Sequence, residues 1–363
     1  MIYSFDIFDT TLVRKWYKPE DLFIEVGKIL EDENLIHNEE YFVKFRKESE
    51  KKCRELSDKE EITIKDIYLI IGQKFSWNIE QINFAIEVEK KIEIDSLRPN
   101  IQIINEINSY ISNCQKVCFI SDMYLPENTI KEALLKNGIY DNFDLYISSS
   151  YGETKHFKSL YKRVINDYSI NPKKLIHRGD NYISDFLSAK SLYINVNFFQ
   201  KKVNRYEDCI YKSEIGNQYI KSLLSGSMQT SRLSKYFENN FKNTIWEIST
   251  NVMGPTLFFY VLWILNNAKE IGLSRLYFIS RDGRILLKIA NEIKIRNKDY
   301  ESIACQYLYG SRQAWHLPAI TKIGEFELNW IFDNTHFLSL NSICNRLSIN
   351  YCEIKKELHV NGF

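Results

Sequence analysis

The sequence lacks an excess of either charge, since 48 lysine and arginine residues stand against 47 aspartate and glutamate residues in a chain of 363. Proteins that hold nucleic acid or an anionic membrane over a broad surface usually carry a basic excess. We therefore expect no nucleic-acid partner. Any recognition of an anion must come from a local group of side chains.

Paired cysteines and long apolar runs are also lacking. The seven cysteines are scattered and none form a Cys-x-x-Cys pair, so neither a disulfide framework nor a zinc site is predicted. The longest apolar run, Pro255 to Leu265, is far shorter than the roughly 20 residues of a membrane span. No secretory leader is recognised. These absences predict free thiols and a cytoplasmic protein without a transmembrane segment. They favour a buried helix at 255–265 over a helix with one face docked on a membrane or a partner.

The pattern of apolar residues predicts an α/β fold. A strand opens the chain before Asp6, and residues 15–97 then show helical periodicity without a convincing strand. From residue 98 to 200 helices alternate with strands at 116–121, 145–149, 174–178 and 195–198. Such alternation indicates a parallel sheet with crossover helices. We expect a core formed by 1–14 and 98–200, with an all-helical insertion at 15–97.

A second α/β unit is predicted after residue 240. Residues 201–240 are polar and weakly periodic, as in a linker or docking segment, and 241–363 begin with a long apolar helix. Only two strands are recognisable there, at 275–280 and 303–309. We interpret this unit as incomplete or as requiring a partner.

Four polar loops follow the predicted core strands, and parallel sheets carry their sites at the carboxyl ends of strands. The first loop contains Asp6, Asp9 and Thr10, and a carboxylate there can act as a nucleophile on phosphorus. The second contains Ser121 and Asp122, whose hydroxyl and amides can hold a phosphoryl oxygen. Each loop by itself is equally consistent with a turn or a helix cap.

The third and fourth loops supply a cation and an acid pair. Lys155 can give a point charge to a phosphate, although Lys158 competes for this role. Asp180 and Asp185 flank a helix start beside Gly179, and such carboxylates suit Mg²⁺, a hard cation that prefers oxygen. A capped turn explains Asp185 but not the second acid at the end of the strand.

In this order the four loops resemble the haloacid dehalogenase-like (HAD) superfamily of aspartate-nucleophile phosphohydrolases. The resemblance covers residues 1 to about 200 and implies a Rossmann-like core with a helical cap at 15–97. It implies Asp6 as nucleophile and Lys155 as its catalytic cation. It places Mg²⁺ at Asp6, Asp180, Asp185 and the backbone carbonyl of Phe8. The substrate phosphate would be bound by Thr10, Ser121, Asp122 and Asn181.

Phe8 departs from this pattern, because the superfamily usually has a second aspartate two residues after the nucleophile as general acid and base. Phenylalanine cannot transfer a proton, so either Asp9 takes the role, or the leaving group needs less protonation, or the enzyme is slow. An aromatic residue here also resembles the haloacid dehalogenases proper, which attack carbon without a metal. The acid pair Asp180 and Asp185 favours the phosphatase over the dehalogenase.

Other candidate residues lie outside the four loops. Arg14 either reaches a second anionic group of the substrate or is a plain surface arginine. In the second unit, Arg281, Asp282 and Arg312 follow the two strands, where helix N-termini and basic groups can bind phosphate. The alternative is that Arg281 and Asp282 only pair and cap. This region is similar to the module that follows a HAD domain in bacterial surface-polysaccharide biosynthesis proteins.

The sequence therefore leads to two main hypotheses. The first is a Mg²⁺-dependent phosphatase for a sugar phosphate or a phosphorylated glycan terminus in capsule or O-antigen synthesis. The second is a catalytically weak HAD-like module that docks onto a polysaccharide glycosyltransferase, which would hold the protein at the periphery of the inner membrane. A less favoured third hypothesis is carbon–halogen hydrolysis.

Overall fold

The computed structural model describes residues 1–363 except 201–203, 215, 333–337, 362–363 and the side chains of 312–313. The described chain divides into two compact units, Met1–Pro255 and Thr256–Phe363. Each unit is considered by itself.

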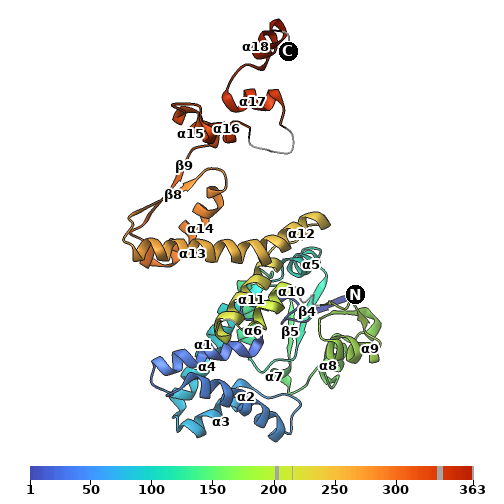
Figure 1. Cartoon of the computed structure of the whole chain (residues 1–363). Coiled ribbons are helices and arrows are strands. Elements are labelled where there is room, and N and C mark those ends of the chain that lie inside the picture. Colours follow the sequence, from blue (N-terminus) through green and yellow to red (C-terminus); the bar gives the residue numbers. More distant parts are fainter. Residues whose placement is uncertain (201–203, 215, 333–337, 362–363) are drawn as a thin grey trace. The chain divides into compact units, whose positions relative to one another are not determined.

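A five-stranded parallel sheet forms the centre of the first unit (Figure 1). The strand order is β5-β4-β1-β6-β7. The strands are β1 (Ile2–Phe5), β4 (Lys116–Ser121), β5 (Asp144–Ile147), β6 (Leu175–Arg178) and β7 (Asn195–Val196). The predicted α/β fold with a parallel sheet is confirmed.

Both faces of this sheet are covered, which explains the run of apolar residues in the middle of β4. Along β4, Val117 and Phe119 pack into one hydrophobic cluster, and Cys118 and Ile120 pack into another. Successive strand residues point to opposite faces, so a strand buried on both faces needs apolar residues at every position. The helices that follow or precede these strands are α5 (Ile101–Ser112), α6 (Glu127–Lys136), α7 (Ser148–Tyr151), α8 (Ser159–Asp167) and α9 (Ala189–Ser191).

Four helices form the insertion that the sequence placed at 15–97, and they make one cluster, blue in Figure 1. After a short 3₁₀ turn at Pro19–Asp21, they are α1 (Leu22–Asp32), α2 (Glu39–Leu56), α3 (Ile64–Phe75) and α4 (Ile79–Ser96). The insertion starts and ends on an antiparallel pair, β2 (Leu12–Arg14) with β3 (Leu97–Pro99). The sequence did not reveal this pair, because three-residue strands are too short to show alternation.

Residues 204–255 belong to the first unit rather than to a linker. They form α10 (Arg205–Tyr211), α11 (Gln218–Leu233), α12 (Asn240–Ile248) and a π-helical turn at Ser249–Met253. Arg232 of α11 makes a buried pair with Glu207 of α10, with Nε 2.7 Å from Oε1. The boundary between units therefore lies after Pro255 and not at residue 241.

Gly226 lets α11 approach the core closely. A Cβ atom at this position would lie 2.1 Å from the backbone oxygen of Lys15. Helix propensity alone predicts that Gly226→Ala stabilises the protein by up to about 1 kcal/mol. We expect the opposite sign, a loss of about 1–3 kcal/mol, because neither backbone can yield without unpacking.

Urea unfolding of Gly226→Ala beside the neighbouring Ser227→Ala measures this effect. Ser227 is exposed on the same helix, so its substitution tests propensity without the contact. A gain in stability in both variants would show that α11 does not rest on the core as described.

The second unit contains a parallel pair of strands, β8 (Arg275–Ile279) and β9 (Ala304–Leu308). Helices α13 (Gly254–Glu270) and α14 (Gly283–Arg296) pack on the pair through a small cluster that includes Val261, Phe278 and Ala290. A 3₁₀ turn at Lys298–Tyr300 precedes β9, and α15 (Arg312–Ala319), α16 (Glu325–Ile331), α17 (Leu340–Leu347) and α18 (Tyr351–Val360) follow it. The described part of this unit thus has the two strands that the sequence predicted.

The apolar run near residue 260 lies on a longer helix than the sequence suggested. Within the described chain, one continuous helical stretch of 31 residues, Asn240–Glu270, is long and apolar enough to cross a membrane by length and composition alone. The expectation of a buried helix is wrong, because Val261 and Leu265 are buried whereas Trp263 is 60 % exposed. We predicted no transmembrane segment, and the described chain contains one weak candidate for such a segment, the helix Asn240–Glu270.

Candidate active site

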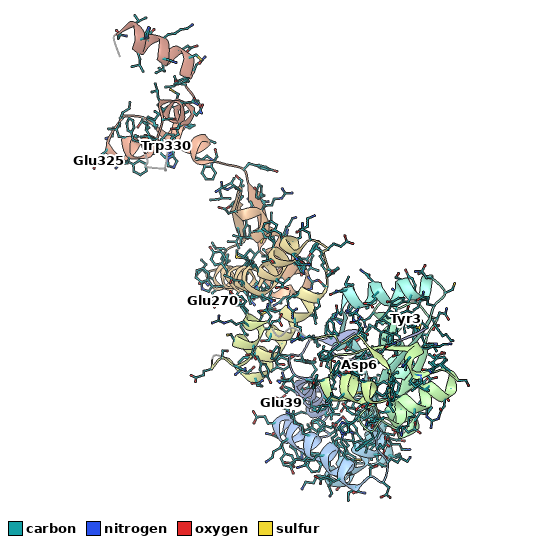
Figure 2. All side chains as sticks on the ribbon, turned by 90° about the vertical axis from the view of Figure 1, so that its right-hand side faces the viewer. Tyr3, Asp6, Glu39, Glu270, Glu325 and Trp330 are labelled. Atoms are coloured by element: carbon teal, nitrogen blue, oxygen red, sulfur yellow. The ribbon has the colours of Figure 1, made fainter. Side chains whose placement is uncertain are left out.

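The four predicted loops meet at one edge of the parallel sheet. Strands β1, β4 and β6 end at neighbouring positions in register, so the residues after them emerge side by side. In Figure 2, Asp6 lies between Tyr3, at the other end of β1, and the inserted helices. We call the space here the carboxylate cavity, of about 400 Å³, lined by Asp6, Phe8, Asp9, Ser121, Asp122, Lys155, Asp180, Asn181 and Asp185 among others.

Lys155 connects two of the loops through its ammonium group. Its Nζ lies 2.5 Å from Oδ1 of Asp6 and 2.6 Å from Oδ1 of Asp185. All three side chains are buried. Of the two lysines that competed for this position in the sequence, the structure places Lys155 against Asp6.

Burial and charge set the protonation of these groups. Burial raises the pKa of Asp6 well above its usual value, more than the adjacent Lys155 lowers it. Burial also disfavours the charged form of Asp185, but Lys155 and His177 outweigh it and hold the pKa of that carboxyl below its usual value. Burial opposes the charge of Lys155, yet Asp185 and Asp6 raise its pKa well above normal. The two acids therefore favour the charged form of Lys155, while burial works against the charged form of Asp6.

His177 is a buried member of this network that sequence reasoning missed. Its Nε2 lies 3.1 Å from Oδ1 of Asp185, and its Nδ1 lies 2.9 Å from Oγ of Ser4. Burial lowers the pKa of His177, which favours the neutral ring. The only signal in the sequence was a histidine that directly follows the apolar residues Leu175 and Ile176 in a predicted strand. Its contact helps to fix the position of Asp185.

Asp6, Asp180 and Asp185 form a donor set that fits Mg²⁺. One carboxylate oxygen from each lies within 4.8 Å of the others. Three carboxylates from two adjacent loops match the oxygen ligands that Mg²⁺ prefers. Gly179 makes the arrangement possible, because a Cβ atom there would lie 2.3 Å from Cγ of Asp185.

Several predicted phosphate ligands shape the loops as well as line the cavity. Thr10 donates to Oδ1 of Asp180 at 3.2 Å and so joins the first loop to the fourth. Asp122 accepts from the backbone N–H of Lys155 at 2.7 Å, which fixes the backbone of the third loop. Asn181 caps the π-helical turn Tyr182–Ser188 by accepting from Ile183 and Ser184. Ser121, buried at the end of β4, lines the cavity.

Arg14 is not among the residues that line the carboxylate cavity, and its predicted role with the substrate stays a prediction. It is buried, and its guanidinium pairs with Glu93 of α4 at 2.7 Å. The same group lies over the ring of Phe8, 4.4 Å from the centroid. Arg14 therefore supports the first loop from behind and is not a surface arginine. Phe8 thus contacts Arg14 through its ring and has no group that can transfer a proton.

The inserted helices contact the site loops through polar groups that the sequence did not single out. Arg46 of α2 binds Glu89 of α4 with two buried hydrogen bonds of 2.8 and 2.9 Å. Tyr124, which follows the second loop, donates to the same Glu89 at 3.0 Å. The helical insertion is thus anchored beside Asp122 and Ser121.

In the second unit, the structure agrees with the alternative in which Arg281 and Asp282 only pair with each other. Arg281 and Asp282 are both largely exposed, and their side chains pair with each other at 3.5 Å. The side chain of Arg312 lies outside the described residues. A phosphate role for this loop stays a prediction.

Comparisons with known proteins find only structural similarity. No family model and no curated protein matches the chain. It is similar to a 2-haloacid dehalogenase from Pseudomonas syringae, at 14 % identity and a TM-score of 0.44 over 56 % of this chain and 89 % of that one. A HAD family enzyme from Bacteroides thetaiotaomicron, in complex with magnesium and inorganic phosphate, has 14 % identity and a TM-score of 0.39 over 56 % and 96 %. A HAD phosphatase from Thermococcus onnurineus has 15 % identity and a TM-score of 0.39 over 56 % and 88 %. Such scores carry no argument about function, which depends on the site itself.

Proposed function

We propose that the protein is a Mg²⁺-dependent phosphomonoester hydrolase that uses Asp6 as nucleophile. The observation that carries the proposal is the meeting of Asp6, Lys155, Asp180 and Asp185 at one strand edge, with Lys155 bonded to two of the three acids. Mg²⁺ held by the three carboxylates would neutralise charge on a bound phosphate and on Asp6. A lysine and a metal site beside a buried carboxylate match the needs of attack on phosphorus.

In this proposal Asp6 attacks the phosphorus atom in line with the ester oxygen. The new bond joins Oδ of Asp6 to phosphorus, while the ester bond breaks and the alcohol leaves with a proton. Water then attacks the same phosphorus, gives up a proton and releases inorganic phosphate from Asp6. Lys155 stabilises the negative charge of the phosphoryl oxygens in both steps.

Asp9 is the proposed proton carrier, because it lines the carboxylate cavity and Phe8 cannot serve. Substitution Asp9→Asn should lower kcat for phosphate release by about 10²-fold, the lower range for loss of a general acid or base. Asn suits the test because Asp9 has a φ of 62°, and asparagine tolerates this left-handed backbone as well as aspartate does. Steady-state kinetics of both proteins would measure the loss, and an unchanged rate would move proton transfer to another group.

The proposal also names the phosphate ester that the protein hydrolyses. We assign a sugar phosphate or a phosphorylated glycan terminus, acted on during capsule or O-antigen synthesis. The support is the sequence resemblance of the second unit to modules of surface-polysaccharide proteins. Location in the cytoplasm, at the inner membrane through a glycosyltransferase partner, belongs to the same proposal.

Phe8 favours a second candidate function, a module that binds phosphate without efficient turnover and docks the second unit onto a glycosyltransferase. The ring of Phe8 packs against the guanidinium of Arg14. Phe8 stands two residues after Asp6, where the superfamily usually has the acid that transfers protons. The two functions differ in phosphate release that requires Mg²⁺. Release of halide in the presence of EDTA would instead indicate the dehalogenase.

A further inference from the structure

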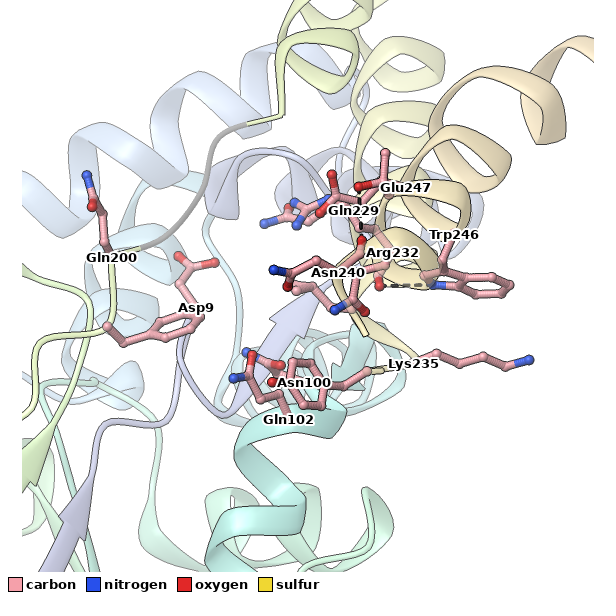
Figure 3. Close-up of a pocket in the computed structure, with 15 residues that line it drawn as sticks. Asp9, Asn100, Gln102, Gln200, Gln229, Arg232, Lys235, Asn240, Trp246 and Glu247 are labelled. Carbon is pink, nitrogen blue, oxygen red and sulfur yellow. Dashed lines mark hydrogen bonds between the residues drawn. The ribbon is translucent and has the colours of Figure 1, made fainter. Parts of the chain in front are cut away.

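A second cavity opens beside the first loop, within the first unit. It has a volume of about 460 Å³ and lies between that loop and helices α11 and α12 (Figure 3). We call it the amide cavity, because its lining includes Asn100, Gln102, Gln200, Gln229, Asn240 and Asn243. Asp9 lines this cavity and the carboxylate cavity alike. A ligand in the amide cavity would therefore lie next to the proposed proton carrier.

The amide cavity and the carboxylate cavity are built from the same backbone segments. The Asn100 side chain donates to the backbone oxygen of Thr10 at 3.0 Å, so a wall residue of one cavity holds the loop of the other. The backbone N–H of Phe199 donates to the oxygen of Gly179 at 2.9 Å, which ties the opposite wall to the fourth loop. The two spaces therefore have a fixed relation to each other.

Gln229 is the clearest sign that the amide cavity has a ligand. It is only 4 % exposed, and its side chain makes no hydrogen bond to any residue that the structure describes. The amide is not sealed in the interior but opens onto the cavity, so a ligand there can pair it. A primary amide both donates and accepts, which matches a hydroxyl group, itself a donor and an acceptor.

The two cations that line the cavity, Arg232 and Lys235, are engaged elsewhere, whereas Asp9 and Glu247 bring carboxylates to its wall. Arg232 is paired with Glu207 by bonds of 2.7 and 3.1 Å. The ammonium of Lys235 lies over the ring of Trp246, 4.7 Å from its centroid. Amides beside an indole ring suit a ligand that has many hydroxyls and some apolar surface but no charge.

We infer that the amide cavity binds the leaving alcohol of the substrate, a neutral group rich in hydroxyls such as a sugar ring. The inference rests on the proposed function for the position of the phosphate at Asp6. In this inference the alcohol is bound by residues of α11 and α12, which come after the core in the sequence, and not by the inserted helices.

Gln229→Leu tests the inference, because it keeps the size of the side chain and removes its hydrogen bonds. The readout is the ratio of kcat/KM for ribose 5-phosphate and glucose 6-phosphate to kcat/KM for phenyl phosphate, which has no hydroxyls. We expect this ratio to fall about 10- to 100-fold, since a site built to bond a hydroxyl depends on that bond. Gln115→Leu, the same change at an exposed position outside the cavity, serves as control. An equal ratio in wild type and Gln229→Leu would overturn the inference.

A binding measurement separates this inference from the proposed function. Saturation-transfer NMR with ribose and glucose should detect binding to wild type and to Asp6→Asn, and at least about 10-fold weaker binding to Gln229→Leu. If the wild-type protein binds sugars through Gln229 but releases no phosphate from any ester, the sugar site in the amide cavity is supported and the phosphatase is rejected. Absence of sugar binding in all proteins, with sugar phosphates and phenyl phosphate hydrolysed alike, would reject the cavity and retain the phosphatase.

Discussion

Asp6→Asn should abolish phosphate release, lowering kcat by at least about 10⁴-fold, as expected when a covalent nucleophile is removed. The amide has nearly the shape of the carboxylate, so the substituted side chain fills the same buried position. It can neither attack phosphorus effectively nor supply a charged ligand to Mg²⁺. The fold should persist, because Lys155 keeps its bond to Asp185.

The measurement is initial-rate release of phosphate from purified proteins, with circular dichroism to verify folding. Asp58→Asn is the matched control, because Asp58 is exposed on the inserted segment. A rate for Asp6→Asn within about tenfold of wild type would contradict a nucleophilic role for Asp6.

Lys155→Met should reduce kcat by about 10²- to 10³-fold, the usual effect of removing one charge-stabilising donor. The same change should affect stability in a way that depends on metal. Without the ammonium, Asp6 and Asp185 lie buried side by side with no cation between them. In EDTA we expect a loss of about 3 kcal/mol in the free energy of unfolding, as for other broken buried ion pairs.

Added Mg²⁺ should restore part of this stability, because a cation bound by the carboxylates replaces the missing charge. Urea unfolding with EDTA and with Mg²⁺ measures the difference. Lys158→Met is the control, since it makes the same change three residues away on a partly exposed side chain. Equal losses for the two variants in activity and stability would show that the lysine in the cavity has no special role.

The sequence allowed the core and the meeting of the four loops to be predicted because both depend on local patterns. Alternation of helices and strands determines a parallel sheet, and a parallel sheet brings the ends of its strands together. Asp6, Ser121 and Asp180 therefore appear at one edge without any knowledge of distances. The roles assigned to these residues remain predictions.

Other features depend on contacts between distant segments, which no local pattern encodes. The polar segment 201–240 resembles a linker, yet Gly226 places α11 against Lys15. Arg14 resembles a surface residue, but Glu93, far along the chain, neutralises it in the interior. The buried His177 shows its role only once Ser4 and Asp185 are brought to either side of its ring.

We propose that the carboxylates of Asp6, Asp180 and Asp185 support Mg²⁺-dependent phosphate transfer. The most direct test is the initial rate of phosphate release from a panel of sugar phosphates that includes ribose 5-phosphate. Wild-type protein is assayed with Mg²⁺, with EDTA, and again after Mg²⁺ is restored. We expect release with Mg²⁺, loss of release with EDTA and recovery on restoration. Release that persists in EDTA, or no release from any ester with Mg²⁺ present, would rule out a Mg²⁺-dependent phosphatase.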